Sequence, residues 1–531
     1  MLAAILLCLV QEGPNPVPDP VVPGRGSASL DILSYSLSLS LDPPLPRTRG
    51  KAELEIRFRE ASTSVALDLN TALEVSRVLV DGAAVRFAHR KDKLVFQVGR
   101  RKKGDILRAQ VSYAGKLARP PWQGDPVGLI PDPHSLVAML EPDGAMNWFP
   151  CNDHPFDKAT FKVAVEVPLG HLAASVGRLE SIHLLFSGRL RFTWTTDLAV
   201  ATYLVPLGAG ILSPILRPGK VPVLDLVEPG DLKAARRSLR EVPDMIPVFE
   251  EWFGPYPFEK YGHVLSRAVG GGMEDQTLSI LERNWALAGD PDLLSHELAH
   301  QWFGDWVSPV RWEDLWINEG WATYGELIWR RHDAPGSERE LLKTWRRSVL
   351  RLARRDSSHT LDTPNVDAMF DVDLVYNKGG MVVHLLEGWM GREAFLKGIA
   401  RFMTAHAGGN ANTESFQKAM EQGGDMDLKP FFDAWVRSNR VPQISLSWKS
   451  RRAGKGWTTD VALEQVQAGP WIPIATDLGF SPGETGPVRA RKPVRFEAGK
   501  AKVSFNSDWK PKKVVLDPGK LLPVLSPNNH R

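Results

Sequence analysis

The sequence is poor in cysteine, with only Cys8 and Cys151 among 531 residues. Two cysteines this far apart cannot build a disulfide framework, and neither has the neighbours that a cysteine-based metal site requires. The sequence therefore excludes a small disulfide-stabilised fold, and any metal site must use other residue types. The length favours about three domains, each able to bury its own core.

The sequence also lacks a hydrophobic run long enough to span a membrane at its N-terminus. Leu2–Val10 is apolar and could form the core of a signal peptide, but it is too short to cross a bilayer as a helix. No Lys or Arg precedes it and no small-residue cleavage motif follows, so a leader and an ordinary tail both stay open. The predicted location is exported, periplasmic or extracellular, if Leu2–Val10 is a signal core, and cytoplasmic otherwise. No stable membrane insertion is predicted beyond this candidate leader.

An excess of charge of one sign is missing as well. The formal net charge is +3, with 24% charged and 43% hydrophobic residues, which is typical of a soluble globular protein. A net charge this small gives no reason to expect a nucleic-acid or membrane-surface partner.

Hydrophobic patterning divides the chain into two β-rich parts that flank a mixed part. Strict alternation, as in Tyr35–Leu41, predicts half-buried strands over residues 26–215, and alternation returns over residues 441–531. Helical spacing prevails over residues 216–440. Residues 1–25 are expected to form a leader and a linker. The predicted fold class is multidomain α+β, with an N-terminal β domain, a mixed α/β domain and a small C-terminal β-sandwich.

His296, Glu297 and His300 form the motif H-E-x-x-H. Residues four apart lie on one face of a helix, so the two imidazoles can bind one metal ion. Asp290 followed by Pro291 predicts the start of this helix, and Gly304 predicts its end. Two core helices with satisfied histidines are the structural alternative.

A third metal ligand is available at Glu319, which a second predicted helix brings back towards the first. A catalytic zinc needs three protein ligands and a fourth position for water, and His296, His300 and Glu319 meet that number. Glu297 points away from the ligand face, where it can accept the proton of a zinc-bound water as the general base.

Five sequence blocks over residues 149–380 resemble, in order, those of the M1 (gluzincin) family of zinc aminopeptidases. The resemblance implies a saddle-shaped N-terminal β domain, a thermolysin-like catalytic domain and one zinc ion per chain. Larger members of that family add a C-terminal helical domain, so the resemblance is to a short form without it. The blocks are FPCNDHP (149–155) with KATF (158–161), WFGPYP (252–257), GGMED (271–275), H-E-x-x-H (296–300) with NEG (318–320), and YNKGG (376–380).

The resemblance also implies roles for residues near the metal. Tyr376 would donate a hydrogen bond to the oxyanion that forms during the reaction, and Glu274 would bind the free α-ammonium of a peptide. Gly271, Gly272 and Met273 would bind substrate, since a strand with no side chain at two positions lets an extended peptide pair with its backbone.

Two positions depart from the family pattern. Asp275 stands where the family has Asn and adds a negative charge beside Glu274. Before the FPC block, Met139 replaces the first residue of a Gln-x-Glu pattern, while Glu141 matches its second, amine-binding residue. Residues two apart in a strand share a face, so Met139 is expected beside Glu141 without a polar contact. Whether Glu141 still binds the amine stays open.

The predicted function is a zinc metallopeptidase that removes N-terminal amino acids from peptides through zinc-activated water. Its expected partners are peptide substrates with a free N-terminus, and no nucleic acid. Two alternatives remain: a catalytically altered protein that serves as a peptide-binding scaffold, or an epoxide hydrolase that uses the same zinc site. The preferred N-terminal residue, the biological substrate and the oligomeric state are not specified by any motif.

Overall fold

The computed structural model describes residues 18–355, 359–364, 366–525 and 529–530. The candidate signal core Leu2–Val10 lies outside these residues. The chain divides into two compact units, which are described in turn. Among the described residues, no helix is long and apolar enough to cross a membrane. Unit 1 holds the residues up to 247 with 255–312 and 407–410, and unit 2 holds 248–254, 313–406 and the residues from 411 onward.

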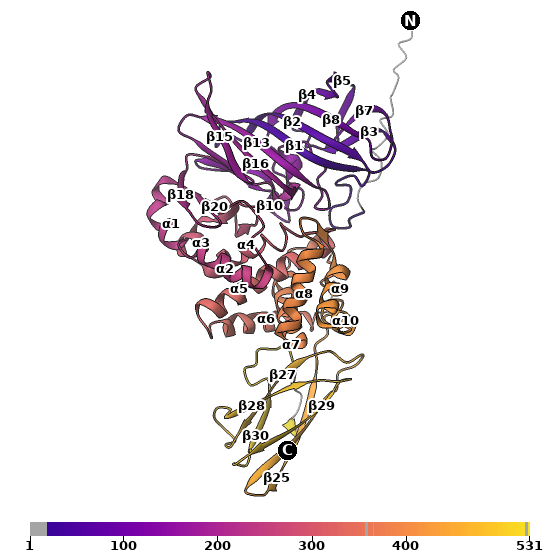
Figure 1. The fold of residues 1–531 in the computed structure, drawn as a ribbon, viewed down its shortest axis with the longest axis vertical. Helices are drawn as coiled ribbons and strands as arrows, with labels where there is room; N and C mark the ends of the chain where they lie inside the picture. Colours follow the sequence, from indigo (N-terminus) through magenta and orange to yellow (C-terminus); the bar gives the residue numbers. More distant parts are fainter. Residues whose placement is uncertain (1–17, 356–358, 365, 526–528, 531) are drawn as a thin grey trace. The chain divides into compact units, whose positions relative to one another are not determined.

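Unit 1 begins with an eight-stranded sheet, drawn in indigo and purple in Figure 1. Its strands pair antiparallel except for β1 and β13, which run parallel. Buried and exposed side chains alternate along β2, so one face of the sheet packs on the core and the other faces solvent. In sheet order the strands are β15 (Arg178–Leu184), β16 (Arg189–Ala201), β13 (Lys158–Pro168), β1 (Leu30–Leu41), β2 (Arg47–Phe58), β8 (Ile106–Lys116), β4 (Leu73–Val80) and β5 (Ala83–Ala84).

Smaller sheets complete the β-rich region of unit 1, in agreement with the alternation in the sequence. They are β3 (Ser62–Asp68), β7 (Lys93–Arg101) and β6 (Phe87–Arg90) in one sheet, β11 (Gly128–Asp132), β12 (Ser135–Met139), β17 (Leu207–Gly210) and β14 (Leu172–Ser175) in another, and the pair β9 (Pro121–Trp122) and β10 (Asp125–Pro126).

The FPCNDHP block has a structural role in unit 1. The ring of Phe149 meets Tyr35 of β1 edge-on, with centroids 5.7 Å apart, and Tyr35 stacks on Phe161 at 4.7 Å. The side chain of Asn152 accepts a hydrogen bond from the backbone N–H of Ser27 and donates to Asp157 at 2.7 Å. The block therefore fastens the sheet to the segment that precedes β1.

That preceding segment is packed, in contrast to the linker expected for residues 1–25. Among its described residues, Val21 and Val22 are fully buried. The buried carboxylate of Asp19 lies 3.1 Å from Nε2 of His154 and accepts the backbone N–H of Trp312 at 2.9 Å. Tertiary contacts thus give residues 18–25 a defined structure, although their proline content alone is typical of a linker.

A five-stranded sheet and short helices form the rest of unit 1. Helical spacing continues from Asp231 to Phe253, but the structure has two helices here, because Pro243 has no backbone N–H to continue the first helix and is tolerated only in the first turn of the second. The sheet order is β18 (Ser213–Arg217), β19 (Val223–Val227), β20 (Tyr261–Ser266), β22 (Ser279–Glu282) and β21 (Gly272–Met273), and the helices are α1 (Leu232–Ser238), α2 (Val242–Phe253), α3 (Arg283–Ala288) and α4 (Pro291–Ala299). The residues of α2 from 248 onward belong to unit 2.

Unit 2 is helical up to residue 435. Tyr376 lies in a π-helical turn, Val372–Lys378, which leads into α7. Asp371 caps this turn by accepting the backbone N–H groups of Asp373 and Leu374. The helices are α5 (Trp316–Asp333), α6 (Glu338–Leu352), α7 (Gly379–Met390), α8 (Arg392–Ala405), α9 (Thr413–Gly424) and α10 (Lys429–Trp435). The short pair β23 (Ser308–Pro309) and β24 (Asn410–Ala411) belongs to unit 1 except for its last residue.

Two glycines bring α5 and α7 together. A Cβ atom on Gly379 would lie 2.8 Å from the Cα of Gly320, so neither helix can carry a side chain at this crossing. Farther along, the hydroxyl of Tyr324 on α5 donates to Glu387 of α7 at 2.7 Å. The crossing fixes Glu319, the neighbour of Gly320, relative to the π-helical turn that carries Tyr376.

Unit 2 ends in two small sheets that pack face to face. Phe480 of one sheet stacks on Phe505 of the other, with ring centroids 4.1 Å apart. One sheet is β29 (Lys500–Ser507), β26 (Gly456–Gln465), β25 (Ile444–Ala453) and β31 (Asn529–His530), and the other is β28 (Ala490–Arg495), β27 (Ala475–Ser481) and β30 (Lys513–Leu516).

The glycine crossing yields a prediction about stability. Gly379→Ala should lower the free energy of unfolding by about 1–3 kcal/mol, because the added methyl group overpacks a backbone contact. Gly388→Ala, on an exposed turn of the same α7, should raise it by up to about 1 kcal/mol, since its Cβ would meet open space and alanine favours the helix. Urea unfolding of both variants measures the difference. Equal stability of the two would show that the crossing tolerates a side chain.

Candidate metal and peptide site

The helix α4 carries the H-E-x-x-H motif. The side chain of Asp290 accepts the backbone N–H of Asp292 at 3.0 Å, which confirms the predicted start of the helix. The predicted end at Gly304 is wrong, because α4 ends at Ala299 and His300 occupies the C-cap position. His300 keeps helical dihedral angles, φ −56° and ψ −27°, so the motif still completes one turn.

The two histidines of the motif face the same point. Their ring centroids lie 4.9 Å apart, and a ring nitrogen of His296 lies within 4.8 Å of a ring nitrogen of His300. Nδ1 of His300 lies 3.1 Å from the carbonyl oxygen of Phe303, which can only accept, so this nitrogen carries the hydrogen. Nε2 of a neutral His300 then holds the lone pair that a metal ion binds, and the carbonyl fixes the orientation of the ring.

Gln301 joins the end of α4 to the GGMED strand. Its side-chain N–H groups donate to the backbone carbonyl of Glu274 at 3.0 Å and to a carboxylate oxygen of Asp305 at 2.6 Å. Its side-chain oxygen accepts the backbone N–H of Thr277 at 2.9 Å and the hydroxyl of Tyr256 at 3.2 Å. The buried carboxamide of Gln301 therefore holds the end of the H-E-x-x-H turn against Glu274 and Thr277.

Lys158, the first residue of the KATF block, fastens the turn that follows α4. Its ammonium group donates to the carbonyl oxygens of Asp305 at 2.7 Å and Trp306 at 3.2 Å. Burial lowers the pKa of Lys158 to about 7, and the charge of Asp305 partly opposes this effect. No local signal in the sequence pointed to Gln301, and Lys158 was known only as part of a block.

The carboxylates of unit 1 gather around this helix. Single ligand atoms of Glu274, Glu297 and His300 all lie within 4.8 Å of one another, and a carboxylate oxygen of Glu141 comes equally near one of Glu274. Glu274 and Glu297 are almost fully buried. The strand β12 ends at Met139, so Glu141 lies just beyond it and the expected shared face of these two residues does not apply.

Asp275 makes this region still more acidic. Its side chain is fully buried, and neither carboxylate oxygen has a hydrogen-bond partner among the described residues. Burial, and then the charges of Glu274 and Glu297, raise the pKa of Asp275 well above its usual range. A cation near Glu274 and Glu297 would oppose this shift, because a nearby positive charge favours the ionised form of a carboxyl group.

The GGMED glycines make room for the carboxylate of Glu297. The strand β21 forms one edge of the five-stranded sheet and pairs with β22 on its other side. A Cβ atom on Gly272 would lie only 1.9 Å from a carboxylate oxygen of Glu297, whereas one on Gly270 would meet nothing within 4 Å. Gly271 has φ +123°, a conformation that glycine alone adopts without strain.

Glu319 and Tyr376 belong to unit 2. Glu319 is buried in the first turn of α5, and Tyr376 is half-buried in the π-helical turn. His296, His300 and Glu319 have the donor types and the number that a catalytic zinc requires. The carboxylate of Asp314, which lies between the H-E-x-x-H motif and Glu319 in the sequence, accepts the backbone N–H and the hydroxyl of Thr413.

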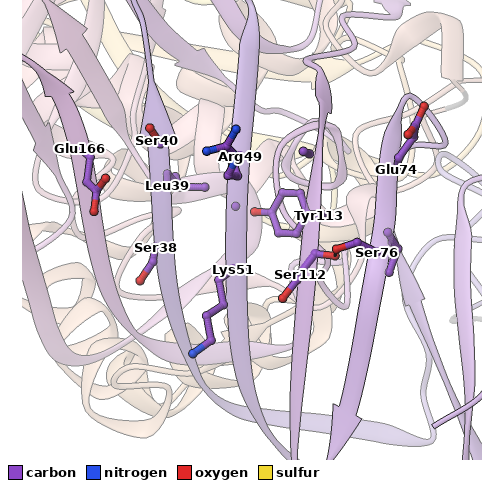
Figure 2. Close-up of a pocket in the computed structure, with 13 residues that line it drawn as sticks. Ser38, Leu39, Ser40, Arg49, Lys51, Glu74, Ser76, Ser112, Tyr113 and Glu166 are labelled. Carbon is purple, nitrogen blue, oxygen red and sulfur yellow. Dashed lines mark hydrogen bonds between the residues drawn. The ribbon is translucent and has the colours of Figure 1, made fainter. Parts of the chain in front are cut away.

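A separate cavity of about 540 Å³ lies on the eight-stranded sheet, and Figure 2 shows its labelled side chains along neighbouring strands. It is lined by serines and by charged residues of both signs. Lys51 pairs with Glu53 at 2.5 Å, and Arg191 pairs with Glu166 at the same distance. The residues that line this hollow include no histidine or cysteine, so it lacks the nitrogen and sulfur ligands that a zinc site requires.

Two family models match the chain. The model of the peptidase family M1 domain matches residues 237–435, and the model of the peptidase M1 N-terminal domain matches residues 32–204. Together they span well over half of the chain, and both end before residue 436.

Curated relatives are similar over the same region. A leucyl aminopeptidase of Saccharolobus solfataricus is 26% identical over 431 residues, which cover 76% of this chain and 52% of that protein. Aminopeptidase M1 of Arabidopsis thaliana is 28% identical, covering 63% and 40%. The chain thus spans about half the length of the curated relatives it matches.

Solved structures match more completely. An M1 zinc metallopeptidase from Deinococcus radiodurans superposes with a TM-score of 0.74 at 28% identity, covering 80% of this chain and 98% of that one. A mutant of that metallopeptidase bound to a Tyr-Ser-Ala substrate superposes with a TM-score of 0.72 at 27% identity. Since these similar structures are zinc metallopeptidases, zinc is the metal that the donor set of this chain implies.

The contact between Gly272 and Glu297 generates a prediction. Gly272→Ala should reduce kcat/KM on any peptide substrate by about 100-fold or more, because the added methyl group displaces the carboxylate of Glu297 beside His300. Gly270→Ala, two residues earlier in the same glycine run, should change kcat/KM by less than about threefold, since its methyl group meets nothing. Steady-state kinetics on one substrate compare the two. A fully active Gly272→Ala enzyme would contradict the placement of Glu297.

Proposed function

This chain belongs to peptidase family M1, and we propose that it removes N-terminal amino acids from peptides with the help of one zinc ion. The observation that carries the proposal is the junction at Gln301. It holds the H-E-x-x-H turn against the strand of Glu274, and so places a metal-binding motif beside a carboxylate suited to a peptide amine. We expect peptides with a free N-terminus to be the substrates.

The zinc ion would be held by His296, His300 and Glu319. Two neutral imidazoles and one carboxylate suit zinc, and the hydrogen bond from His300 to Phe303 is the outer support that metal-bound histidines usually have. When bound, zinc lowers the pKa of a water molecule to near neutrality and polarises a substrate carbonyl.

Glu297 would act as the general base. Its carboxylate lies within 4.8 Å of His300 and is nearly buried, so it is near enough to the metal position to accept a proton from water. The proton can then pass to the leaving amine from the same carboxylate. Gly272 leaves the space in which this side chain sits.

Glu274 would bind the α-ammonium of the substrate, with Glu141 as a second anchor. Charge-assisted hydrogen bonds from an ammonium to carboxylates are among the strongest polar contacts in proteins. The proximity of these two carboxylates supports the assignment, since two acids this close favour a shared cation. Met139, two residues before Glu141 in the sequence, has no group that could bind an ammonium.

The backbone of Gly271, Gly272 and Met273 would pair with the substrate, because β21 is an edge strand whose outer side can accept another chain. Tyr376 would donate its phenolic hydrogen to the oxyanion. Its place in a π-helical turn supports this role, since such turns occur often at functional sites.

The finer description of the fold is part of the same proposal. We expect the region 26–215 to be the saddle-shaped β domain of the family, 216–440 the thermolysin-like catalytic domain and 441–531 a β-sandwich, with 1–25 as leader and linker. Export to the periplasm or the exterior, if Leu2–Val10 is a signal core, remains a prediction.

The alternatives are less well supported. A peptide-binding scaffold without activity has no need of the full set His296, Glu297, His300 and Glu319, and this chain retains all four. An epoxide hydrolase is not favoured, since the relatives and structures described above are aminopeptidases and metallopeptidases.

The metal assignment predicts a contrast between two variants of α4. His300→Ala should lose its zinc, because two remaining ligands are too few to hold the ion. Glu297→Gln should keep about one zinc per chain but lose about 10²–10⁴-fold in kcat, since an amide cannot accept the proton. Metal analysis and steady-state kinetics on both proteins test this. Full zinc occupancy in His300→Ala, or normal turnover in Glu297→Gln, would overturn the assignment.

The amine site predicts a dependence on substrate charge. Glu274→Gln should reduce kcat/KM on peptides with a free amine by about 10–100-fold, the worth of a hydrogen bond to a charged group. Glu141→Gln should cause a similar loss if it shares the ammonium. N-acetylated peptides serve as the control, because they lack the charge and should be poor substrates of every form. Equal cleavage of free and acetylated peptides by the unaltered enzyme would indicate an endopeptidase.

A further inference from the structure

The net charge of +3 conceals an uneven distribution along the chain. Residues 441–531 contain 15 Lys and Arg against seven Asp and Glu, a formal charge of +8. Residues 1–440 contain 50 basic and 55 acidic residues, a formal charge of −5. The excess positive charge therefore belongs to the C-terminal sheets, which lie beyond both family matches.

The strand register shows where these cations gather. Trp457 pairs with Arg452 on one side and with Ser507 on the other, so the turn between β25 and β26 lies beside the loop 508–512 that follows β29. Lys513 pairs with Ser481, so the connection 482–489 between β27 and β28 lies at the same end. We call this end, formed by residues 451–456, 482–489 and 508–513, the cationic tip.

The cationic tip lies away from the helices of unit 2. The strand β25 starts at Ile444, shortly after α10, and ends at Ala453 in the tip. Ten residues of extended strand cover about 33 Å, so the tip is displaced by roughly that distance from the end of the sandwich that follows the helices. Figure 1 shows the sandwich as the last part of unit 2.

Positive charge dominates the cationic tip, with seven Lys and Arg against the two acids Glu484 and Asp508. Arg451 has a partner, Asp460, at 3.4 Å. Five others are exposed and make no ion pair within the described part of the chain. These five are Arg452, Lys455, Arg489, Lys510 and Lys512.

Two tryptophans hold some of these cations in place. The ammonium of Lys510 lies 4.9 Å from the ring centre of Trp457, and the guanidinium of Arg452 lies 5.9 Å from it. The guanidinium of Arg489 lies 5.4 Å from the ring centre of Trp509. The cations thus cover the indole faces, so the tip offers fixed positive charge rather than open aromatic surfaces on which nucleic-acid bases could stack.

From this arrangement we propose that the cationic tip docks the enzyme on a membrane surface rich in anionic phospholipids. Exposed like charges repel one another when no partner is present, and a negatively charged surface relieves that repulsion. Several Lys and Arg next to one another are what such a surface attracts. The docking is peripheral, uses no inserted segment and is independent of the peptidase activity proposed above. The net charge alone gave no reason to expect a membrane-surface partner, because it conceals the uneven distribution of charge along the chain.

The test is co-sedimentation of the full chain with lipid vesicles. Vesicles of phosphatidylcholine mixed with phosphatidylglycerol should bind the protein at low salt and release it at high salt, because salt screens the attraction between exposed charges. Vesicles of phosphatidylcholine alone should not bind it. The triple variant Lys455→Glu, Arg489→Glu and Lys512→Glu, with one residue from each tip segment, should bind anionic vesicles about 100-fold more weakly, since each cation contributes roughly fivefold.

A matched variant separates the cationic tip from total charge. Lys233→Glu, Arg236→Glu and Arg237→Glu, all exposed on α1, make the same change in net charge and should leave vesicle binding unaltered. The milder variant Lys455→Gln, Arg489→Gln and Lys512→Gln should bind anionic vesicles with an intermediate affinity. It serves as a control for misfolding caused by charge reversal. Equal binding to neutral vesicles, unchanged binding by the tip variants or no binding at all would overturn the proposal. Tip-dependent binding to double-stranded DNA in the absence of vesicle binding would also overturn it, in favour of a nucleic-acid partner.

Discussion

The hydrogen bonds of Gln301 are the constraint on which the rest of the site depends. A metallopeptidase that acts on chain ends needs a metal at a set distance from the group that binds the substrate amine. Here the side chain of Gln301, the residue after His300, donates a hydrogen bond to the backbone carbonyl of Glu274 and accepts one from the backbone N–H of Thr277. The carboxamide is fully buried, so a lost bond would leave an unsatisfied polar group and cost about 1–3 kcal/mol. The H-E-x-x-H turn and the strand of Glu274, both in unit 1, are therefore held in a fixed relation to each other.

Glycines allow close approaches at two other places in the structure. At Gly272 the absence of a Cβ lets the carboxylate of Glu297 lie against the strand where a substrate backbone would pair. At Gly320 and Gly379 the same absence lets α5 meet α7, which fixes Glu319 relative to the turn of Tyr376. The glycines of the NEG and GGMED blocks thus have a steric reason, independent of any family resemblance.

Much of the fold and the candidate site could be predicted from the sequence, because the signals are local. Alternation predicted the β-rich ends of the chain, and the pair Asp290 and Pro291 predicted the start of α4. The spacing of His296 and His300 predicted their common face, which the structure shows. The roles of Glu319, Tyr376 and Glu274 remain predictions.

What could not be predicted depends on tertiary contacts. The end of α4 was misplaced because the turn after it is held by Lys158, which lies 147 residues before its partner Asp305 in the chain. The order of residues 18–25 depends on Asp19 binding His154 and Trp312. The π-helical turn at Tyr376 could not be predicted, because a single such turn is too short to produce a hydrophobic pattern in the sequence. The cationic tip emerges only when strand register brings three distant connections together.

The most direct test of the central claim is mass spectrometry of the products formed from a mixture of unmodified and N-acetylated peptides. The account predicts ladders that shorten by one residue at a time from the free N-terminus, with the acetylated peptides intact. Removal of zinc by a chelator should abolish the ladders, and added zinc should restore them. Internal fragments, or ladders that persist without zinc, would contradict it.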